Sequence, residues 1–256
     1  MQRNKRVAAM LFVLCFALIA LGTRLQLKGP RNSFRQTKTE PQSPNFEQFP
    51  IVDFDEKEPS DPAVRSARAA KGRKYSKRYL PKISETTDQL YSAADWDVGL
   101  PAIPNAKSSA IVIGTISKSE AHVTENRTAI YSEFTVYPDV VVKNDLENPV
   151  EVRHPITFQR NGGRVRMPSG KIVVSWTSHQ NMPRVGSRYV LFLTHDFETK
   201  GDTGKDFYLL TGYEIRTGRV FPLDDTLSGR AYKDVEESLF LKDLFSSVAS
   251  TSIPSN

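Results

Sequence analysis

Cysteine is nearly absent from this chain of 256 residues. Cys15 is the single one, and it lies inside the first apolar run. One cysteine forms no intramolecular disulfide and supplies no cysteine-based metal site outside that run. The sequence also contains neither a Gly-x-Ser-x-Gly motif nor a phosphate-binding P-loop. An exported domain of this chain would therefore have to be stable through its core alone, which a chain of this length can provide.

Metal-ligand patterns are lacking as well. The four histidines stand in different predicted loops or strand ends, and no two have a spacing such as His-x-x-x-His; they are His122, His154, His179 and His195. We expect them to be solvated loop residues. Asp224-Asp225 follows the last predicted strand and is not part of a calcium-binding loop. The sequence thus predicts no metal and no cofactor.

The charge is unevenly distributed. Residues 1–107 hold 18 Lys/Arg against 11 Asp/Glu, residues 108–225 hold 14 against 14, and residues 226–256 hold 3 against 4. Phosphate neutralisation supplies most nucleic-acid affinity, so a neutral domain argues against a nucleic-acid partner. The apolar fraction of 39% is modest and indicates that part of the chain is not globular.

Residues 1–22 resemble an export segment. Arg3, Lys5 and Arg6 precede 16 residues without a charge, at positions 7–22. As a helix, these would span about 24 Å, less than the roughly 30 Å of a hydrocarbon core. The segment is therefore either an uncleaved membrane anchor, with the remaining chain outside the cytoplasm, or a signal peptide cleaved near Gly22, which leaves a periplasmic or secreted protein. A buried core helix is a third interpretation.

Residues 23–84 are rich in proline and mixed charge, which predicts a disordered basic linker. Basic residues without an intervening acid run through its second half: Arg65, Arg68, Lys71, Arg73, Lys74, Lys77, Arg78 and Lys82. They suit an anionic lipid or polymer surface, and the interleaved Tyr75 and Tyr79 would suit single-stranded nucleic acid. A solvated tether is the plainer alternative. Residues 85–107 should form an extended lead-in that packs Trp96 and Leu100 on the next domain.

Residues 108–225 predict a mainly β domain. Residues 189–193 form an apolar run too short for a helix, and such a strand needs cover on both faces. Further short strands are expected at 110–116, 130–142, 150–160, 164–167, 171–177, 206–215 and 219–222. We expect Gly114 to mark a bulge or close approach, Pro138 to bend its strand, and Gly162-Gly163 to form a hairpin turn. This spacing predicts a small closed or partly open antiparallel β-barrel, OB-like in type.

Residues 226–256 change to a helical period of apolar positions, preceded by acidic residues that suit a helix start. We predict a short amphipathic helix that caps the barrel, with partner binding as an alternative role.

Four arginines surround two turns of the β domain: Arg160, Arg164, Arg166 and Arg184. Arginine recognises carboxylates and phosphates bidentately, so a cluster on one barrel edge would be a binding site. Protection of an exposed edge strand is the alternative. Ser169 and Lys171 also have the residue types of a Ser–Lys dyad, on spacing alone.

Several segments resemble a family of exported bacterial proteins to which no activity is assigned: Tyr131-Ser-Glu-Phe-Thr-Val136, Gly162-Gly-Arg-Val-Arg-Met-Pro-Ser-Gly170, residues 182–193, Leu210-Thr-Gly-Tyr213 and Arg219-Val-Phe-Pro-Leu-Asp224. The phrase Pro183-x-x-Gly-x-x-Tyr-x-x-Phe-Leu193 resembles a strand of OB-like, netrin- and TIMP-type barrels. The resemblance covers about residues 95–225. It implies a small β-barrel outside the cytoplasm and no catalytic residues.

These observations predict a non-enzymatic envelope protein whose barrel binds another protein or an anionic envelope polymer. A hydrolase or protease-like enzyme with an unrecognised site is the alternative, followed by an OB-like oligonucleotide binder.

Overall fold

The computed structural model describes residues 44–76, 80–92, 99–146, 148–195 and 206–251. The chain divides into two units, Met1–Glu40 and Pro41–Asn256, and every described residue belongs to the second. The predicted export segment at 1–22 thus lies outside the described residues. Among the helices of the described ranges, none combines the length and the apolar character needed to cross a bilayer.

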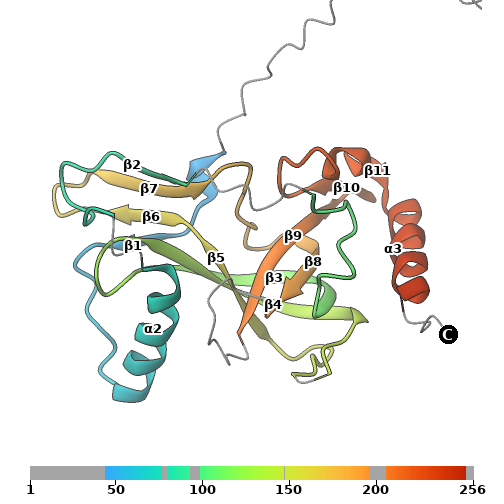
Figure 1. Cartoon of the computed structure of the whole chain (residues 1–256), viewed down its shortest axis with the longest axis horizontal. Coiled ribbons are helices and arrows are strands. Elements are labelled where there is room, and N and C mark those ends of the chain that lie inside the picture. Colours follow the sequence, from blue (N-terminus) through green and yellow to red (C-terminus); the bar gives the residue numbers. More distant parts are fainter. Residues whose placement is uncertain (1–43, 77–79, 93–98, 147, 196–205, 252–256) are drawn as a thin grey trace, which may run out of the picture. The chain divides into compact units, whose positions relative to one another are not determined.

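A closed five-stranded β-barrel forms the centre of the second unit (Figure 1). Its strands are β3 (Ala110–Val123), β4 (Ile130–Lys143), β5 (Ile156–Asn161), β8 (Arg188–Thr194) and β9 (Phe207–Arg216). They follow the order β9-β5-β4-β3-β8, and pairing of β8 with β9 closes the barrel. The predicted small barrel is confirmed. One pair, β5 with β9, is parallel, and all the others are antiparallel.

Strand β8 is apolar on both faces because each face lies in a different core. Leu191 and Leu193 pack inside the barrel with Phe134 and Phe158. Val190 and Phe192 point the other way, into a second cluster completed by the C-terminal helix. The expectation that this strand is covered on both sides is confirmed, and it makes β8 the wall shared by two cores.

The long strands β3 and β4 bend where the sequence predicts. Ile113 pairs with Val140 and Gly114 with Pro138, so Asp139 is an extra residue and forms a bulge. A β-carbon on Gly114 would lie 2.9 Å from the carbonyl carbon of Tyr137 and closer still to its oxygen. Glycine is required there because the neighbouring backbone leaves no room for a side chain.

A second sheet lies beside the barrel. It has the order β1 (Ile51–Asp53), β6 (Gly163–Arg166), β7 (Ile172–Thr177) and β2 (Gln89–Ser92), in which β6 and β7 are antiparallel and the outer two strands are parallel to their neighbours. The predicted hairpin at Gly162-Gly163 is wrong, because these glycines carry the chain from β5 in the barrel to β6 in this sheet. In the predicted lead-in, Leu100 is buried and Trp96 lies outside the described residues.

The N-terminal arm, residues 44–76, is folded and differs from the predicted disordered linker. It contains the short helix η1 (Phe46–Gln48), β1 and α2 (Pro62–Tyr75). Asp61 caps α2 by accepting a hydrogen bond from the Ala63 N–H, and Pro62 suits its first position. The arm gains order from contacts with the barrel and the second sheet, which local sequence pattern does not show. Residues 23–43 of that prediction lie outside the described part of the chain.

The C-terminal region continues the barrel sheet and then covers it. β10 (Arg219–Pro222) pairs with β9, and β11 (Val235–Glu236) follows the turn η2 (Gly229–Tyr232). Helix α3 (Glu237–Thr251) buries Phe240 and Leu244 against the outer side of β8. The predicted short C-terminal helix is confirmed, and in Figure 1 it lies on the opposite side of the barrel from α2.

We expect Gly114→Ala to lower the free energy of unfolding by roughly 1–3 kcal/mol, because the added methyl group forces the β3–β4 pair apart. The measurement is chemical denaturation of the two proteins side by side. Gly72→Ala is the matched control: its β-carbon would meet atoms no closer than 3.7 Å, and alanine favours a helix. Equal stability of Gly114→Ala and the parent chain would contradict the proposed close approach.

Candidate functional site

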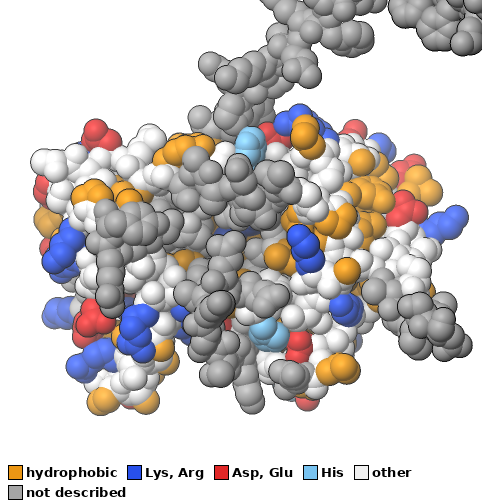
Figure 2. Space-filling model, in the orientation of Figure 1, with side chains coloured by type: hydrophobic (Ala, Val, Ile, Leu, Met, Phe, Trp, Pro, Cys, Tyr) orange, Lys and Arg blue, Asp and Glu red, His pale blue; other side chains and the backbone are white. Residues whose placement is uncertain are grey.

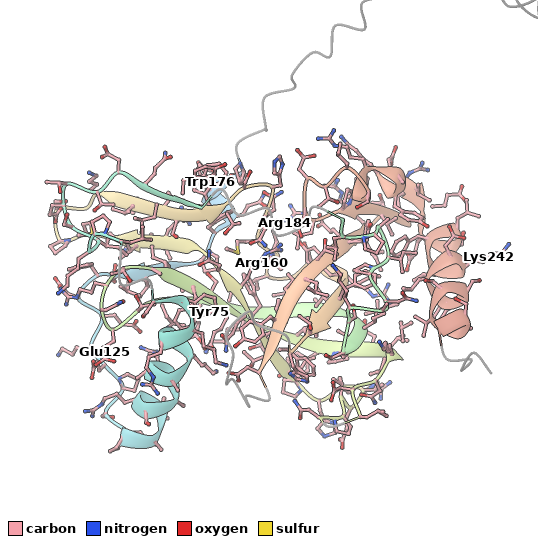
Figure 3. All side chains as sticks on the ribbon, in the orientation of Figure 1. Tyr75, Glu125, Arg160, Trp176, Arg184 and Lys242 are labelled. Atoms are coloured by element: carbon pink, nitrogen blue, oxygen red, sulfur yellow. The ribbon has the colours of Figure 1, made fainter. Side chains whose placement is uncertain are left out.

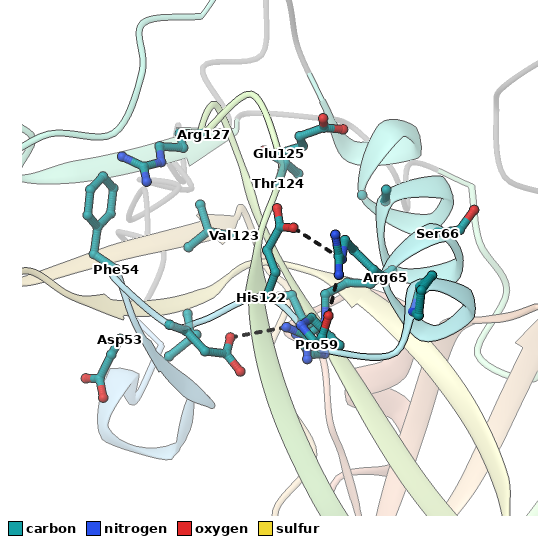
Figure 4. A pocket seen from close by; sticks show the side chains of 17 residues that line it. Asp53, Phe54, Pro59, Arg65, Ser66, His122, Val123, Thr124, Glu125 and Arg127 are labelled. Carbon is teal, nitrogen blue, oxygen red and sulfur yellow. Dashed lines mark hydrogen bonds and ion pairs between the residues drawn. The ribbon is translucent and has the colours of Figure 1, made fainter.

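A pocket of about 420 Å³ lies between the N-terminal arm and the end of β3 (Figure 4). The arm contributes the segment from Val52 to Pro62 and one side of α2, and the barrel contributes the turn that joins β3 to β4. Phe54 and Val123 form part of its apolar wall. Because both parts line it, the pocket forms only when the arm packs against the barrel.

Charged side chains of both signs line this pocket. They are the carboxylates of Asp53, Glu56, Glu58 and Glu125 and the guanidinium groups of Arg65, Arg68 and Arg127. Glu58 pairs with Arg65 and Glu56 with Arg68, both at 3.5 Å and partly exposed. Glu125 has no ion pair with another described residue, and Arg127 stacks over the Phe54 ring at 4.3 Å. Asp53 also pairs with Arg166 at 3.2 Å, so acids and arginines around the pocket balance, and the pocket offers both signs of charge to a ligand.

His122 lines the same pocket from β3 and is almost fully buried. Its Nε2 lies 3.2 Å from Oε2 of Glu133 on β4, at an ion-pair distance. The other carboxylate oxygen of Glu133 lies 2.6 Å from Nζ of Lys71 on α2. Nδ1 of His122 has no hydrogen-bond partner among the described residues. Glu133 thus joins the pocket histidine to the helix that covers the barrel.

His122 and Lys71 determine the pKa of the Glu133 carboxyl group. Burial alone would raise its pKa, but hydrogen bonds from His122 and Lys71 outweigh burial and lower the pKa to about 2. The carboxylate under α2 therefore stays ionised well below the usual pKa of a glutamate.

Aromatic side chains continue this network along α2. The Tyr75 ring stacks on Tyr131 with centroids 4.8 Å apart, and its hydroxyl donates to Oε1 of Gln159 at 3.1 Å. Lys74 donates to the hydroxyl of Tyr208 at 2.6 Å and to Asp206 at 3.1 Å. Burial raises the pKa of Tyr75 well above its usual value, so the phenol stays protonated and able to donate. Figure 3 shows Tyr75 at the end of α2 nearest the barrel.

The residues predicted to contact an anionic surface have different surroundings. Four pair with carboxylates of the chain itself: Arg65, Arg68, Lys71 and Lys74. Arg73 and Lys82 are exposed, and Lys77 and Arg78 lie outside the described residues. The lower left of Figure 2, where α2 lies, shows several basic side chains with an acidic one among them. Four of the six described residues of this set are thus paired within the chain.

The four arginines of the predicted cluster each contact other groups of the chain. Arg160 is buried and pairs with Asp224 at 2.7 Å. Arg164 donates to the backbone oxygens of Glu47 and Phe49, both at 2.9 Å, and Arg166 pairs with Asp53 at 3.2 Å.

Arg184 forms an ion pair with Glu214, and Figure 3 shows its place near Arg160 between the two sheets. Each arginine of the predicted cluster therefore has a partner within the chain. Arg164 and Arg166 hold the N-terminal arm, which gives them a structural role that the sequence did not indicate.

Ser169 and Lys171 do not contact each other as a catalytic dyad would. The Ser169 hydroxyl donates to Glu85 at 2.5 Å, and Nζ of Lys171 donates to Asp88 at 2.7 Å. An activated serine requires its base within hydrogen-bond distance. Here the carboxylates of the predicted lead-in hold both side chains in an exposed turn.

Sequence reasoning missed His122 and Glu133. The prediction of a solvated loop histidine is wrong at His122, because β3 runs to Val123 and carries this residue under α2. Residues 130–137 alternate between apolar and polar positions, which puts Glu133 and Tyr131 on one face of the strand. The missing information was that a helix covers this face.

The pocket can bind and orient a ligand through charge and apolar contact. A His–carboxylate pair also resembles a general base with its orienting group. Within the described ranges, however, His122 hydrogen-bonds no hydroxyl or thiol that it would activate. The geometry therefore supports recognition more directly than catalysis.

We expect the stability of the protein to depend on Glu133 at acidic pH. Its pKa lies below the usual 4.5, so its contribution of about 3 kcal/mol is present above that value and is lost as the pH falls toward 2. Glu133→Gln should unfold more easily at neutral pH and show a flatter loss of stability between about pH 5 and pH 2. Urea denaturation across this range measures both effects.

Glu120→Gln provides the matched control, because Glu120 faces Glu133 in the strand register but is exposed. The assignment is wrong if both variants have the same pH dependence as the parent chain.

Removing the charge of Asp224 should destabilise the fold strongly. Asp224→Asn leaves the buried Arg160 guanidinium without its counter-ion, at a cost of about 3–5 kcal/mol. Asp225→Asn is the control, because that neighbour forms an exposed pair with Arg230 worth less than about 1 kcal/mol. Calorimetry on the three proteins tests this ordering, and equal losses for the two variants would refute it.

Comparison with models of known protein families gives no match for this chain. Comparison with curated protein sequences also finds no matching protein. The functional conclusion therefore depends on the residues themselves.

Proposed function

We propose that this protein is exported, remains at a membrane or is released from it, and acts as a binding module for another protein outside the cytoplasm. The basic N-terminus and the apolar run at 7–22 support export. The composite pocket between the N-terminal arm and the barrel supports binding and is the observation that carries the proposal.

The chemistry of the pocket favours a protein ligand over an anionic polymer. Its four carboxylates are matched by its three arginines and by Arg166, which pairs with Asp53, so the pocket is not a basic site. A polyanion would find no excess of basic groups there, whereas a polypeptide segment with Lys or Arg side chains would find Glu125, which has no ion pair with another described residue. A short basic segment is the ligand that fits.

The other functions considered from the sequence gain no support from a specific contact. Ser169 and Lys171 are held apart by carboxylates, which argues against a Ser–Lys hydrolase at that turn. An oligonucleotide would bring phosphates to a pocket that has no excess of basic groups.

Site-specific photo-crosslinking tests the proposed site. A photoreactive phenylalanine analogue at Glu125 should give a discrete protein adduct when the full chain is produced in its own cells and irradiated. The same analogue at Lys242, on the exposed side of α3 in Figure 3, is the control and should give none. Adducts are identified by mass spectrometry in the membrane and soluble fractions.

Glu125 crosslinking that matches the Lys242 control would overturn the proposed site. An adduct formed only in the cytoplasm would overturn the proposed location.

A further inference from the structure

Helix α2 is attached to the barrel through several polar contacts and one buried aromatic side chain, Tyr75. Lys71 pairs with Glu133, Lys74 binds Asp206 and Tyr208, and Tyr75 donates to Gln159. These three side chains follow the i, i+3, i+4 spacing that places residues on one face of a helix. The barrel face under α2 therefore contacts two lysine ammonium groups and one tyrosine ring, which follow one another along a single face of the helix.

Little apolar surface fixes α2 in place. Of its 14 residues, Gly72 and Tyr75 are buried, and Val64 is half exposed. The ion pairs of Lys71 and Lys74 are only partly exposed, but they bury little apolar surface of the helix. A helix of this length is marginal by itself in water. Opening of α2 should therefore require much less free energy than unfolding of the barrel.

The barrel face under α2 has the character of a recognition surface. Tyr131 and Glu133 on β4, Gln159 on β5 and Tyr208 on β9 present aromatic rings, a carboxylate and an amide outward. This face is continuous with the pocket, because His122 lines the pocket and also contacts Glu133. A carboxylate next to aromatic rings suits a ligand that carries ammonium groups and an aromatic side chain.

We propose that α2 is an intramolecular substitute for the partner, and that the partner is a protein with a basic, tyrosine-bearing helix that displaces α2 from this face. The inference rests on one part of the proposed function, the protein partner with a basic segment, and not on the pocket, which α2 helps to line. It specifies that segment: the partner carries Lys-x-x-Lys-Tyr, or a close equivalent, on one helical face. In the free protein α2 shields the site, and the partner must compete with it.

The test uses a fluorescent peptide of residues 61–76 as the probe for the partner helix. It is added to the full-length chain in detergent and to the full-length Lys71→Gln/Lys74→Gln variant, whose own α2 is weakened. Binding is followed by fluorescence anisotropy. A scrambled peptide of the same composition controls for non-specific attraction of a basic sequence.

We expect the variant to bind the peptide at least about tenfold more tightly than the parent chain, since the competing helix is weaker. This binding should weaken at least about tenfold between about 50 mM and about 500 mM NaCl. Equal affinity of parent and variant, or equal binding of the scrambled peptide, overturns the proposal.

Hydrogen exchange on the parent chain keeps the test independent of how well the variant folds. Backbone amides of α2 should exchange through local opening, long before those of β4 and β8. Exchange of α2 only on global unfolding would show that it is a permanent part of the fold and would refute the inference.

The two proposals fail in different experiments. In one outcome, a partner crosslinks to position 125 while hydrogen exchange shows that α2 never opens locally. That combination overturns only the proposed displacement of α2. Peptide binding to the variant without any crosslink from position 125 overturns the pocket as the site and retains the barrel face.

Discussion

The buried ion pair between Arg160 and Asp224 is the contact on which the described unit depends most. Arg160 lies at the end of β5, just before the chain leaves the barrel for the second sheet. Asp224 follows β10 and also accepts a hydrogen bond from the Asn181 backbone at 3.0 Å. Both side chains are almost completely buried. One pair therefore fixes the crossing point of the barrel, the second sheet and the turn before β8, and neither charge has water as an alternative partner.

The C-terminal helix and the N-terminal arm are attached on different sides of the barrel. Strand β8 gives one face to the barrel core and the other to the cluster under α3. On the other side, Arg164 and Arg166 on β6 hold the N-terminal arm through backbone oxygens and Asp53. The two ends of the described chain are held by different combinations of contacts. The C-terminal helix is held by apolar burial, whereas the N-terminal arm combines polar contacts with the burial of Phe49, Val52 and Tyr75.

The barrel was predictable because its information is local. Alternation in residues 130–137, the apolar run at 189–193 and the punctuation at Gly114 and Pro138 each fix a strand or a bend without reference to distant residues. The N-terminal arm was not predictable for the opposite reason. Strand β1 is three residues long and takes its order from backbone pairing with β6, and α2 has no apolar stripe. The candidate site was not predictable for the same reason. His122 and Glu133 become neighbours only through the β3–β4 register, and α2 then covers them.

The basic residues between positions 65 and 82 show what the sequence alone could not predict about charge. Read along the chain, the basic residues between 65 and 82 and the neutral barrel look like a solvated tether beside an unrelated domain. In three dimensions Lys71 and Lys74 supply the counter-ions for Glu133 and Asp206, and Arg65 and Arg68 pair with acids of their own arm. Four residues of the basic run are therefore neutralised by carboxylates of the same chain. Under the proposal that a partner displaces α2, that partner would have to supply the cations that Lys71 and Lys74 now supply to this acidic and aromatic face.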